Sequence, residues 1–461
     1  MKKKMMKWLA LSLIMVLTGM AVGCAKTDKP TEPNATEDHG SDQSASQETK
    51  TPTSDIPTTE SSDETPATDH PGEVDPSESE APTGPEENPY EGMELPEEML
   101  PGGIVYDVDH QYLYGVGYVD DQMNNRVTVD QAVYLIKSLG SRSVRVWSNC
   151  VENSHKLKDW YVPRLHELAK KLKDAGIQVI FTFYQWESPE GTWTYIPRRN
   201  LTEGSNYMIA LKNWEDMISM VVKEFPEIDY WELGNEWNHT GAINPTDYKA
   251  DGSGGPAFTY EEKADITTDL ILRTMRAARK AGSNATMLLP AMAPSDGMDG
   301  IAMTSYLDRI YKNIESGDWG TTNPRDFFDA LAWHPYLQSM PDVEWVSNNN
   351  RVYQVAIEHG DAGIPVYLTE LGFPDGGNPK ADAEQANYLV AAYDLIQKYM
   401  PYVESLHYYR MFTDSSRGSD TYGLINQPED GFGPKAKGLA YQKMTGGKGD
   451  LYKFYLPLDE D

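Results

Sequence analysis

The amino-acid sequence predicts an α/β protein built on a single (β/α)8 barrel, the TIM barrel, and three observations carry this prediction. Short apolar runs bounded by turn residues recur eight times between residues 101 and 461. Long amphipathic segments separate these runs, and such alternation is typical of parallel strands joined by crossover helices. The region is somewhat longer than an average barrel, as expected for a barrel with loop insertions.

The expected elements follow one another in order along this region. Strands, each a short run of mostly apolar residues, are expected at 112–119, 143–147, 178–183, 229–233, 286–290, 330–333, 366–369 and 405–409. Amphipathic helices are expected at 129–139, 162–174, 210–223, 260–281, 303–314, 352–358, 383–399 and 436–444. A doubly wound open sheet is the alternative, but no strand is followed by a dinucleotide-binding or P-loop glycine pattern.

The N-terminus has the features of a targeting segment. Lysines crowd the first seven residues, and an apolar stretch over 8–22 follows that is too short for a good spanning helix. The stretch ends in Ala21-Val22-Gly23-Cys24, which resembles a bacterial lipobox. We therefore expect residues 1–23 to be a lipoprotein signal peptide. A lipidated Cys24 would anchor the exported protein to the outer face of the bacterial cell membrane. An ordinary secretory signal with a chance cysteine is the alternative.

Residues 24–100 form a region of different composition. Thr, Ser, Pro, Glu and Asp dominate it, and aromatic or branched apolar residues are almost absent. Such a segment cannot bury enough apolar surface to offset the entropy lost on ordering, so we expect it to be disordered. A tether between the anchor and the barrel domain at 101–461 is the simplest role, and a solubilising tail is the alternative.

Charge and cysteine content exclude several classes of protein. The formal net charge of −31 disfavours nucleic acid as a partner and is compatible with a neutral substrate such as a polysaccharide. Only two cysteines are present, so an acylated Cys24 leaves Cys150 without a disulfide partner. Clusters of cysteine and histidine with zinc-ligand spacing are absent. We expect no metal, no cofactor and a monomeric barrel.

Two glutamates follow two of the expected strands. Glu236 comes just after the fourth strand, in Gly234-Asn235-Glu236, and Glu370 ends the seventh, in Thr369-Glu370-Leu371-Gly372. Barrel enzymes place their chemistry at the carboxyl ends of the strands, so these two side chains are expected across the mouth from each other. A facing pair of carboxyl groups is the minimum equipment for breaking a glycosidic bond.

These segments resemble the retaining β-glycosidases of glycoside hydrolase clan A, which are (β/α)8 barrels. The resemblance extends to Arg145 in the second strand and to His334-Pro335-Tyr336 after the sixth. It implies that Glu236 is the acid/base and Glu370 the nucleophile, and that Asn235 contacts the sugar 2-hydroxyl. Within the clan, cellulase-like members and the β-xylosidase and α-iduronidase type are both open.

Residues around the pair have expected supporting roles. Arg145 can supply a cation and Tyr336 a hydrogen bond to keep Glu370 ionised. His334 is expected to hold a nearby side chain or the substrate, with a satisfied core histidine as the alternative.

Aromatic residues follow several of the strands. Trp186 and Trp237 are the expected sugar platforms, because sugar rings stack on such side chains. Clan members usually carry a tryptophan at the end of strand eight. It is missing here, so Tyr408 or Tyr409 is expected to replace it.

The expected function is a retaining glycoside hydrolase that cleaves β-linked sugars in poly- or oligosaccharides. A non-catalytic carbohydrate-binding lipoprotein on a degenerate barrel is one alternative, and a two-lobed solute-binding lipoprotein is another. The sequence leaves open the sugar, its linkage, and exo or endo action.

Overall fold

The structure is a computed structural model that describes most of the chain beyond the acidic segment. The described residues are 100–453, without 107, 124–125, 184–193, 240–241, 250–251, 295–300, 415–420 and 428–430. The expected signal peptide, Cys24 and the tether lie outside these residues. Among the helices described, none combines the length and the apolar character needed to cross a membrane.

Eight parallel strands form the central sheet. They are β1 (Tyr114–Val119), β2 (Ser143–Ser148), β5 (Gln178–Phe183), β7 (Tyr230–Glu232), β9 (Thr286–Leu288), β10 (Leu331–Trp333), β11 (Val366–Leu371) and β12 (Val403–Tyr408). The hydrogen-bonded order is β10-β11-β12-β1-β2-β5-β7-β9, so neighbours in sequence are neighbours in space.

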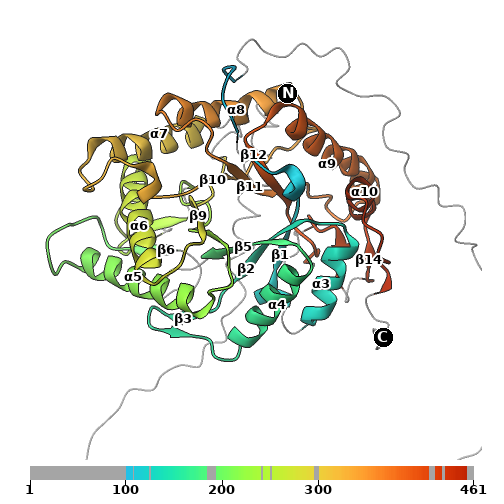
Figure 1. The fold of residues 1–461 in the computed structure, drawn as a ribbon, viewed down its shortest axis with the longest axis horizontal. Coiled ribbons are helices and arrows are strands. Elements are labelled where there is room, and N and C mark those ends of the chain that lie inside the picture. The colour runs from blue at the N-terminus through green and yellow to red at the C-terminus, as the bar shows by residue number, and fades with distance from the viewer. Residues whose placement is uncertain are drawn as a thin grey trace, which may run out of the picture. The chain divides into compact units, whose positions relative to one another are not determined.

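The two ends of this order meet and close the sheet into a barrel. Bridges pair Leu288 with Ala330 and Met292 with Trp333. The backbone N–H of Leu289 donates to Ala330 O at 2.9 Å, and the N–H of His334 donates to Met292 O at 2.8 Å. Figure 1 shows the resulting ring of strands with helices outside it, and the predicted (β/α)8 fold is confirmed.

Helices surround the barrel. They are α2 (Asp120–Met123), α3 (Val129–Ser138), α4 (Val162–Asp174), α5 (Asn206–Glu224), α6 (Tyr260–Lys280), α7 (Ile301–Ser316), α8 (Val343–Glu358), α9 (Pro379–Tyr399) and α10 (Ala436–Thr445). Short 3-10 turns are η3 (His110–Tyr112) and η4 (Pro324–Asp326). Short strand pairs in the loops are β3 (Val151–Asn153) with β4 (Lys156–Leu157), β6 (Thr194–Ile196) with β8 (Ile243–Pro245), and β13 (Ile425–Asn426) with β14 (Gly433–Pro434).

Two helices begin earlier than predicted, because their N-cap residues are polar and the prediction followed the apolar residues. Helix α8 begins at Val343 rather than at 352, because the Asp342 carboxylate accepts from the N–H of Trp345. Helix α5 begins at Asn206 rather than at 210, because the hydroxyl of Ser205 accepts from the N–H of Met208. The first strand begins at Tyr114, because residues 110–112 form a 3-10 turn.

Two layers of apolar packing hold the fold. The larger one fills the space between the strands and the helices, and includes Leu165, Ile218 and Leu389, all fully buried. The smaller one groups Ile180 and Ala332 with four other buried residues on the strand faces that also carry Thr182 and His334. Because side chains alternate along a strand, this second cluster fills the inside of the barrel below the polar groups described next.

Candidate active site

Seven polar side chains from four strands and the segments that follow them gather at the carboxyl end of the barrel. Arg145 lies in β2 and Glu232 ends β7. Glu370 lies within β11. Asn235 and Glu236 follow β7, while His334 and Tyr336 follow β10, as expected from the sequence. Their contacts, given below, join side chains as far as 225 residues apart in the chain.

Glu236 sits on a tight turn whose backbone conformation is unusual. Its φ angle is 54°, in the left-handed region that a residue with a side chain rarely adopts. The turn is fixed on both sides: the Glu236 N–H donates to Ala291 O at 2.7 Å, and the His239 N–H donates to Glu236 O at 2.8 Å. The Asn238 amide exchanges two further hydrogen bonds with the backbone of Ala293, at 2.6 and 2.8 Å. The surrounding structure therefore holds a strained backbone that aims the carboxyl group.

Glu370 lies in β11, where the pairing with β12 shifts register between Leu368 and Leu371, and it has a different set of partners. Its side chain is 7% exposed, against 20% for Glu236. Nη1 of Arg145 donates to Oε1 at 2.5 Å, and the Tyr336 hydroxyl donates to Oε2 at 2.8 Å. Both donors favour the ionised carboxylate.

Arg145 is fully buried and is shared between two carboxylates. Its Nε donates to Glu232 at 2.7 Å, and its Nη2 donates to Oδ1 of Asn235 at 2.8 Å. The hydroxyl of Thr182 also donates to Glu232, at 2.7 Å. Burial acts to lower the pKa of Arg145, but the charges of Glu232 and Glu370 outweigh it and raise that pKa. The guanidinium is therefore a fixed cation beneath the site.

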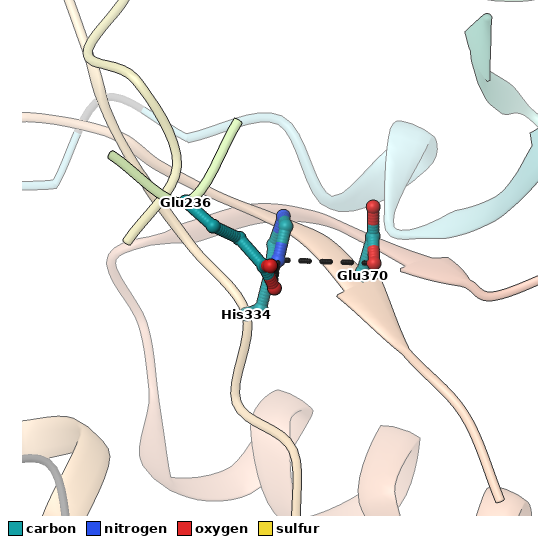
Figure 2. Close-up of side chains that lie close together, drawn as sticks. All are labelled: Glu236, His334 and Glu370. Carbon is teal, nitrogen blue, oxygen red and sulfur yellow. Dashed lines mark hydrogen bonds and ion pairs between the residues drawn. The ribbon is translucent and has the colours of Figure 1, made fainter. Parts of the chain in front are cut away.

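His334 lies between the two glutamates. Its Nδ1 is 2.9 Å from Oε1 of Glu236 and 3.8 Å from Oε2 of Glu370. Figure 2 shows the three side chains converging from three segments of the chain. One carboxylate oxygen of each glutamate and Nδ1 all lie within 4.8 Å of one another, so the carboxyl groups face each other directly. Nε2 of His334 is buried and has no hydrogen-bond partner among the described residues.

The two carboxyl groups respond oppositely to this environment. Burial raises the pKa of Glu370, and the neighbouring charge of Glu236 adds to the rise. Burial also acts to raise the pKa of Glu236, but the hydrogen bond and positive charge of His334 lower it below its usual range. The charges of His239 and Arg145 also act to lower the pKa of Glu236.

An arc of aromatic side chains borders Glu370. The rings of Trp147 and Tyr409 lie 6.2 Å apart, those of Tyr409 and Tyr422 5.5 Å apart, and those of Tyr422 and Tyr336 6.3 Å apart. Gly372 permits this packing, since a Cβ there would lie 2.1 Å from Tyr409 O and 2.8 Å from the ring of Tyr422. One member of the arc, Tyr409, directly follows β12, the eighth strand of the barrel.

Two of the expected sugar platforms are corrected by the structure. Trp237 is 3% exposed and packs edge-on against Trp214 in the hydrophobic core. The turn folds it back over Gly234, where a Cβ would lie 2.3 Å from its ring. Tyr408 is also fully buried, and its hydroxyl accepts from the N–H of Phe373 at 3.3 Å. Neither ring offers a face to a sugar.

The remaining expected platforms have different outcomes. Tyr409 belongs to the aromatic arc. Trp186 lies outside the described residues.

The sequence prediction missed Glu232 and Tyr422. Glu232 carried a signal, because it is an acidic residue inside an apolar strand run with the same inward parity as the other barrel residues. Tyr422 carried none, since it lies in a loop outside every periodic pattern.

Comparison with known proteins gives one sequence relative and many structural ones. Endoglucanase A of Clostridium longisporum is 22% identical over 322 residues, which cover 66% of this chain and 55% of that protein. The chain thus spans about half the length of this curated relative. No protein-family model matches the sequence.

Solved structures agree on the fold. A β-glucosidase from Thermotoga maritima superposes with a TM-score of 0.50 at 11% identity, covering 75% of this chain and 100% of that one. A broad-specificity endoglucanase from Clostridium longisporum gives 0.50 at 13% identity with the same coverage. Both likenesses agree with the (β/α)8 fold of this chain.

Proposed function

We propose that this chain is a retaining glycoside hydrolase that cleaves β-linked sugars in poly- or oligosaccharides. The observation that carries the proposal is the pairing of Glu236 and Glu370 across the barrel mouth, with carboxylate oxygens within 4.8 Å of each other. Retaining enzymes hold their two carboxyl groups about 5–5.5 Å apart, whereas inverting enzymes separate them by about 6.5–9.5 Å to admit a water molecule. The close pair supports the retaining mechanism.

In the first step, an oxygen of Glu370 attacks the anomeric carbon while the glycosidic bond breaks. Glu236 gives its proton to the departing oxygen, and a glycosyl ester on Glu370 remains. Arg145 and Tyr336 support this assignment, because their hydrogen bonds favour the ionised form of the attacking carboxylate and fix its direction.

In the second step, Glu236 takes a proton from water, whose oxygen attacks the same carbon, and Glu370 leaves as a carboxylate. His334 is the partner of Glu236 and supports its change between acid and base.

Stereochemistry tests the mechanism directly. Proton NMR of a hydrolysed β-glycoside should show the β-anomer first, with the α-anomer appearing only by later mutarotation. Initial formation of the α-anomer would overturn the retaining mechanism. A panel of aryl β-glycosides and β-linked polysaccharides provides the substrates and identifies the sugar.

A non-catalytic carbohydrate-binding protein is the second candidate, and the sequence relative does not exclude it. Retention of a glycan on the protein without any released sugar on thin-layer chromatography would favour it. The intact set of charged contacts around both glutamates favours the enzyme.

We also propose that the barrel is anchored to the outer face of the cell membrane through a lipidated Cys24. The order of basic, apolar and small residues before Cys24 supports this location. Metabolic labelling with a fatty acid should mark the wild-type chain and not Cys24→Ser, and equal labelling of both would refute the anchor.

A further inference from the structure

We propose that Glu236, His334 and Glu370 bind a divalent transition-metal ion of the Zn²⁺ type, and that this ion blocks the proposed active site. The blocking role rests on the proposed function, whereas the binding itself does not. Two carboxylates and one imidazole are donors that Zn²⁺ accepts in proteins. Among the described residues, these are the only three His, Cys, Asp or Glu side chains gathered closely enough to hold an ion.

The donor atoms are spaced for one ion. Zn²⁺ lies about 2.0–2.2 Å from nitrogen and oxygen ligands, so two tetrahedral ligands are about 3.4 Å apart. Nδ1 of His334 is 2.9 Å from Oε1 of Glu236 and 3.8 Å from Oε2 of Glu370, on either side of that value. The donor oxygens of Glu236 and Glu370 lie within 4.8 Å of each other, so the two carboxyl groups must draw together for one ion to bind all three side chains in Figure 2.

The required oxygen of Glu370 is available. Arg145 occupies Oε1, so the cation and the ion do not compete for the same atom. Oε2 accepts only the Tyr336 hydroxyl among the bonds described, and a carboxylate oxygen has a second lone pair for the ion. The 20% exposure of the Glu236 side chain provides the entry path.

Charge favours a divalent ion. The contacting group contains three carboxylates, those of Glu232, Glu236 and Glu370, against the single guanidinium of Arg145. With these groups ionised and His334 neutral, as a metal ligand must be, the excess is two negative charges. A divalent cation neutralises this excess and removes the repulsion between the facing glutamates.

The same geometry limits the affinity. Zinc-ligating histidines usually donate their second ring N–H to a fixed acceptor, and Nε2 of His334 has none among the described residues. We therefore expect reversible binding that a chelator removes, not a permanent structural site. A bound ion occupies both carboxyl groups, so it competes with the sugar for the site.

Isothermal titration of the full chain with Zn²⁺ alone tests the binding. Wild type should bind one Zn²⁺ ion. The substitutions His334→Asn and Glu370→Gln should each lower the affinity for that ion at least tenfold. The matched control is His359→Asn, because His359 also contacts two carboxylates, those of Asp308 and Glu315, but through opposite ring nitrogens. This control should keep the wild-type affinity. Cys150 should not compete, because burial raises the pKa of its thiol to about 12.

Three results would overturn the proposal: no Zn²⁺ binding to wild type, unchanged binding in the two site variants, or equal loss in the His359 control. Circular dichroism confirms that each variant is folded. A measurement on wild type alone adds a second test, since Zn²⁺ should raise KM without lowering kcat and EDTA should reverse it. Zinc binding without any glycosidase activity would refute the proposed function and leave the metal site standing.

Discussion

The strand-four end and the strand-seven end of the barrel each present a glutamate, and they present it in different ways. Glu236 stands on a turn with φ 54°, is one-fifth exposed and has His334 as its side-chain partner. Glu370 lies within strand β11, is 7% exposed and accepts hydrogen bonds from Arg145 and Tyr336. One carboxyl group has a partner that can exchange a proton, and the other has donors that keep their protons.

This difference supports the two proposed roles. The pKa of Tyr336 lies well above its usual range because of burial and the charge of Glu370, so its hydroxyl stays a donor. Arg145 stays charged for the reason given above. A carboxylate between two permanent donors suits a nucleophile, while a carboxyl group beside an imidazole suits proton transfer. Five single substitutions test this difference between the two glutamates.

The largest effect is expected from Glu370→Ala. Removing the proposed nucleophile leaves no group to form the glycosyl ester, so kcat should fall by about 10,000-fold or more. Steady-state kinetics with an aryl glycoside measures it. Glu404→Gln is the matched control, because Glu404 is a buried glutamate of the next strand whose carboxylate accepts from the N–H of Asp109 instead. Wild-type turnover in Glu370→Ala would remove the assignment.

Glu236→Ala should lose less and should be rescued. General acid catalysis contributes about 100- to 10,000-fold, and a substrate with a good leaving group needs little of it. Added azide should then restore turnover by attacking the glycosyl ester, with a β-glycosyl azide as the product. If azide rescued Glu370→Ala with that product instead, the two roles would be reversed.

Tyr336→Phe removes one of the two donors to Glu370. A hydrogen bond to a charged group is worth about 1.5–3 kcal/mol, so kcat/KM should fall by about 10- to 100-fold. The acidic limb of the pH profile should move to higher pH, because the ionised carboxylate loses a partner. An unmoved limb would show that the hydroxyl does not stabilise the anion.

Glu232→Gln tests the other donor to Glu370, which is Arg145, by removing the second carboxylate that Arg145 contacts. Arg145 would then balance Glu370 alone, which lowers the pKa of Glu370. The acidic limb of kcat/KM should move to lower pH, opposite to the shift in Tyr336→Phe, with a rate loss of about tenfold from a less firmly held guanidinium. Shifts of the two variants in the same direction would contradict this account of Arg145.

The smallest effect concerns the turn that carries Glu236. Lys263 is 2% exposed and its Nζ donates to His239 O in that turn; burial lowers its pKa to about 8. The unfolded chain holds this proton up to a pKa near the ordinary 10.5, so it binds more protons than the native state between these values.

The free energy of unfolding should therefore rise with pH from about 8 to about 10.5, by about 3 kcal/mol relative to Lys263→Met. Urea denaturation across this range measures the difference, and a constant difference would contradict the burial of a charged lysine. At the strand-seven end the buried Lys437 also donates to a backbone carbonyl, that of Phe373 at 2.7 Å, but it pairs with the Asp375 carboxylate as well.

The order of strands and helices could be predicted from the sequence. That order also predicts that both glutamates lie at the carboxyl end of the barrel. Eight alternating units allow one parallel closed sheet, and the carboxyl ends of parallel strands share one rim. Counting strands therefore placed Glu236 and Glu370 together without any knowledge of loop structure. Arg145 and Tyr336 were expected beside Glu370 and lie there.

The contacts that each side chain makes at that end of the barrel depend on the tertiary structure. Trp237 is a residue type that often stacks on sugars. The turn that contains Glu236, with its positive φ angle, folds the Trp237 ring into the core. Nothing in the sequence pairs Glu232 with Arg145, which lies 87 residues away in the chain. The fold brings the guanidinium of Arg145 into contact with the Glu232 carboxylate. Periodicity fixes which face of a strand a residue occupies. Partners across the barrel depend on distances between strands and on backbone angles in the turns, which no local pattern encodes.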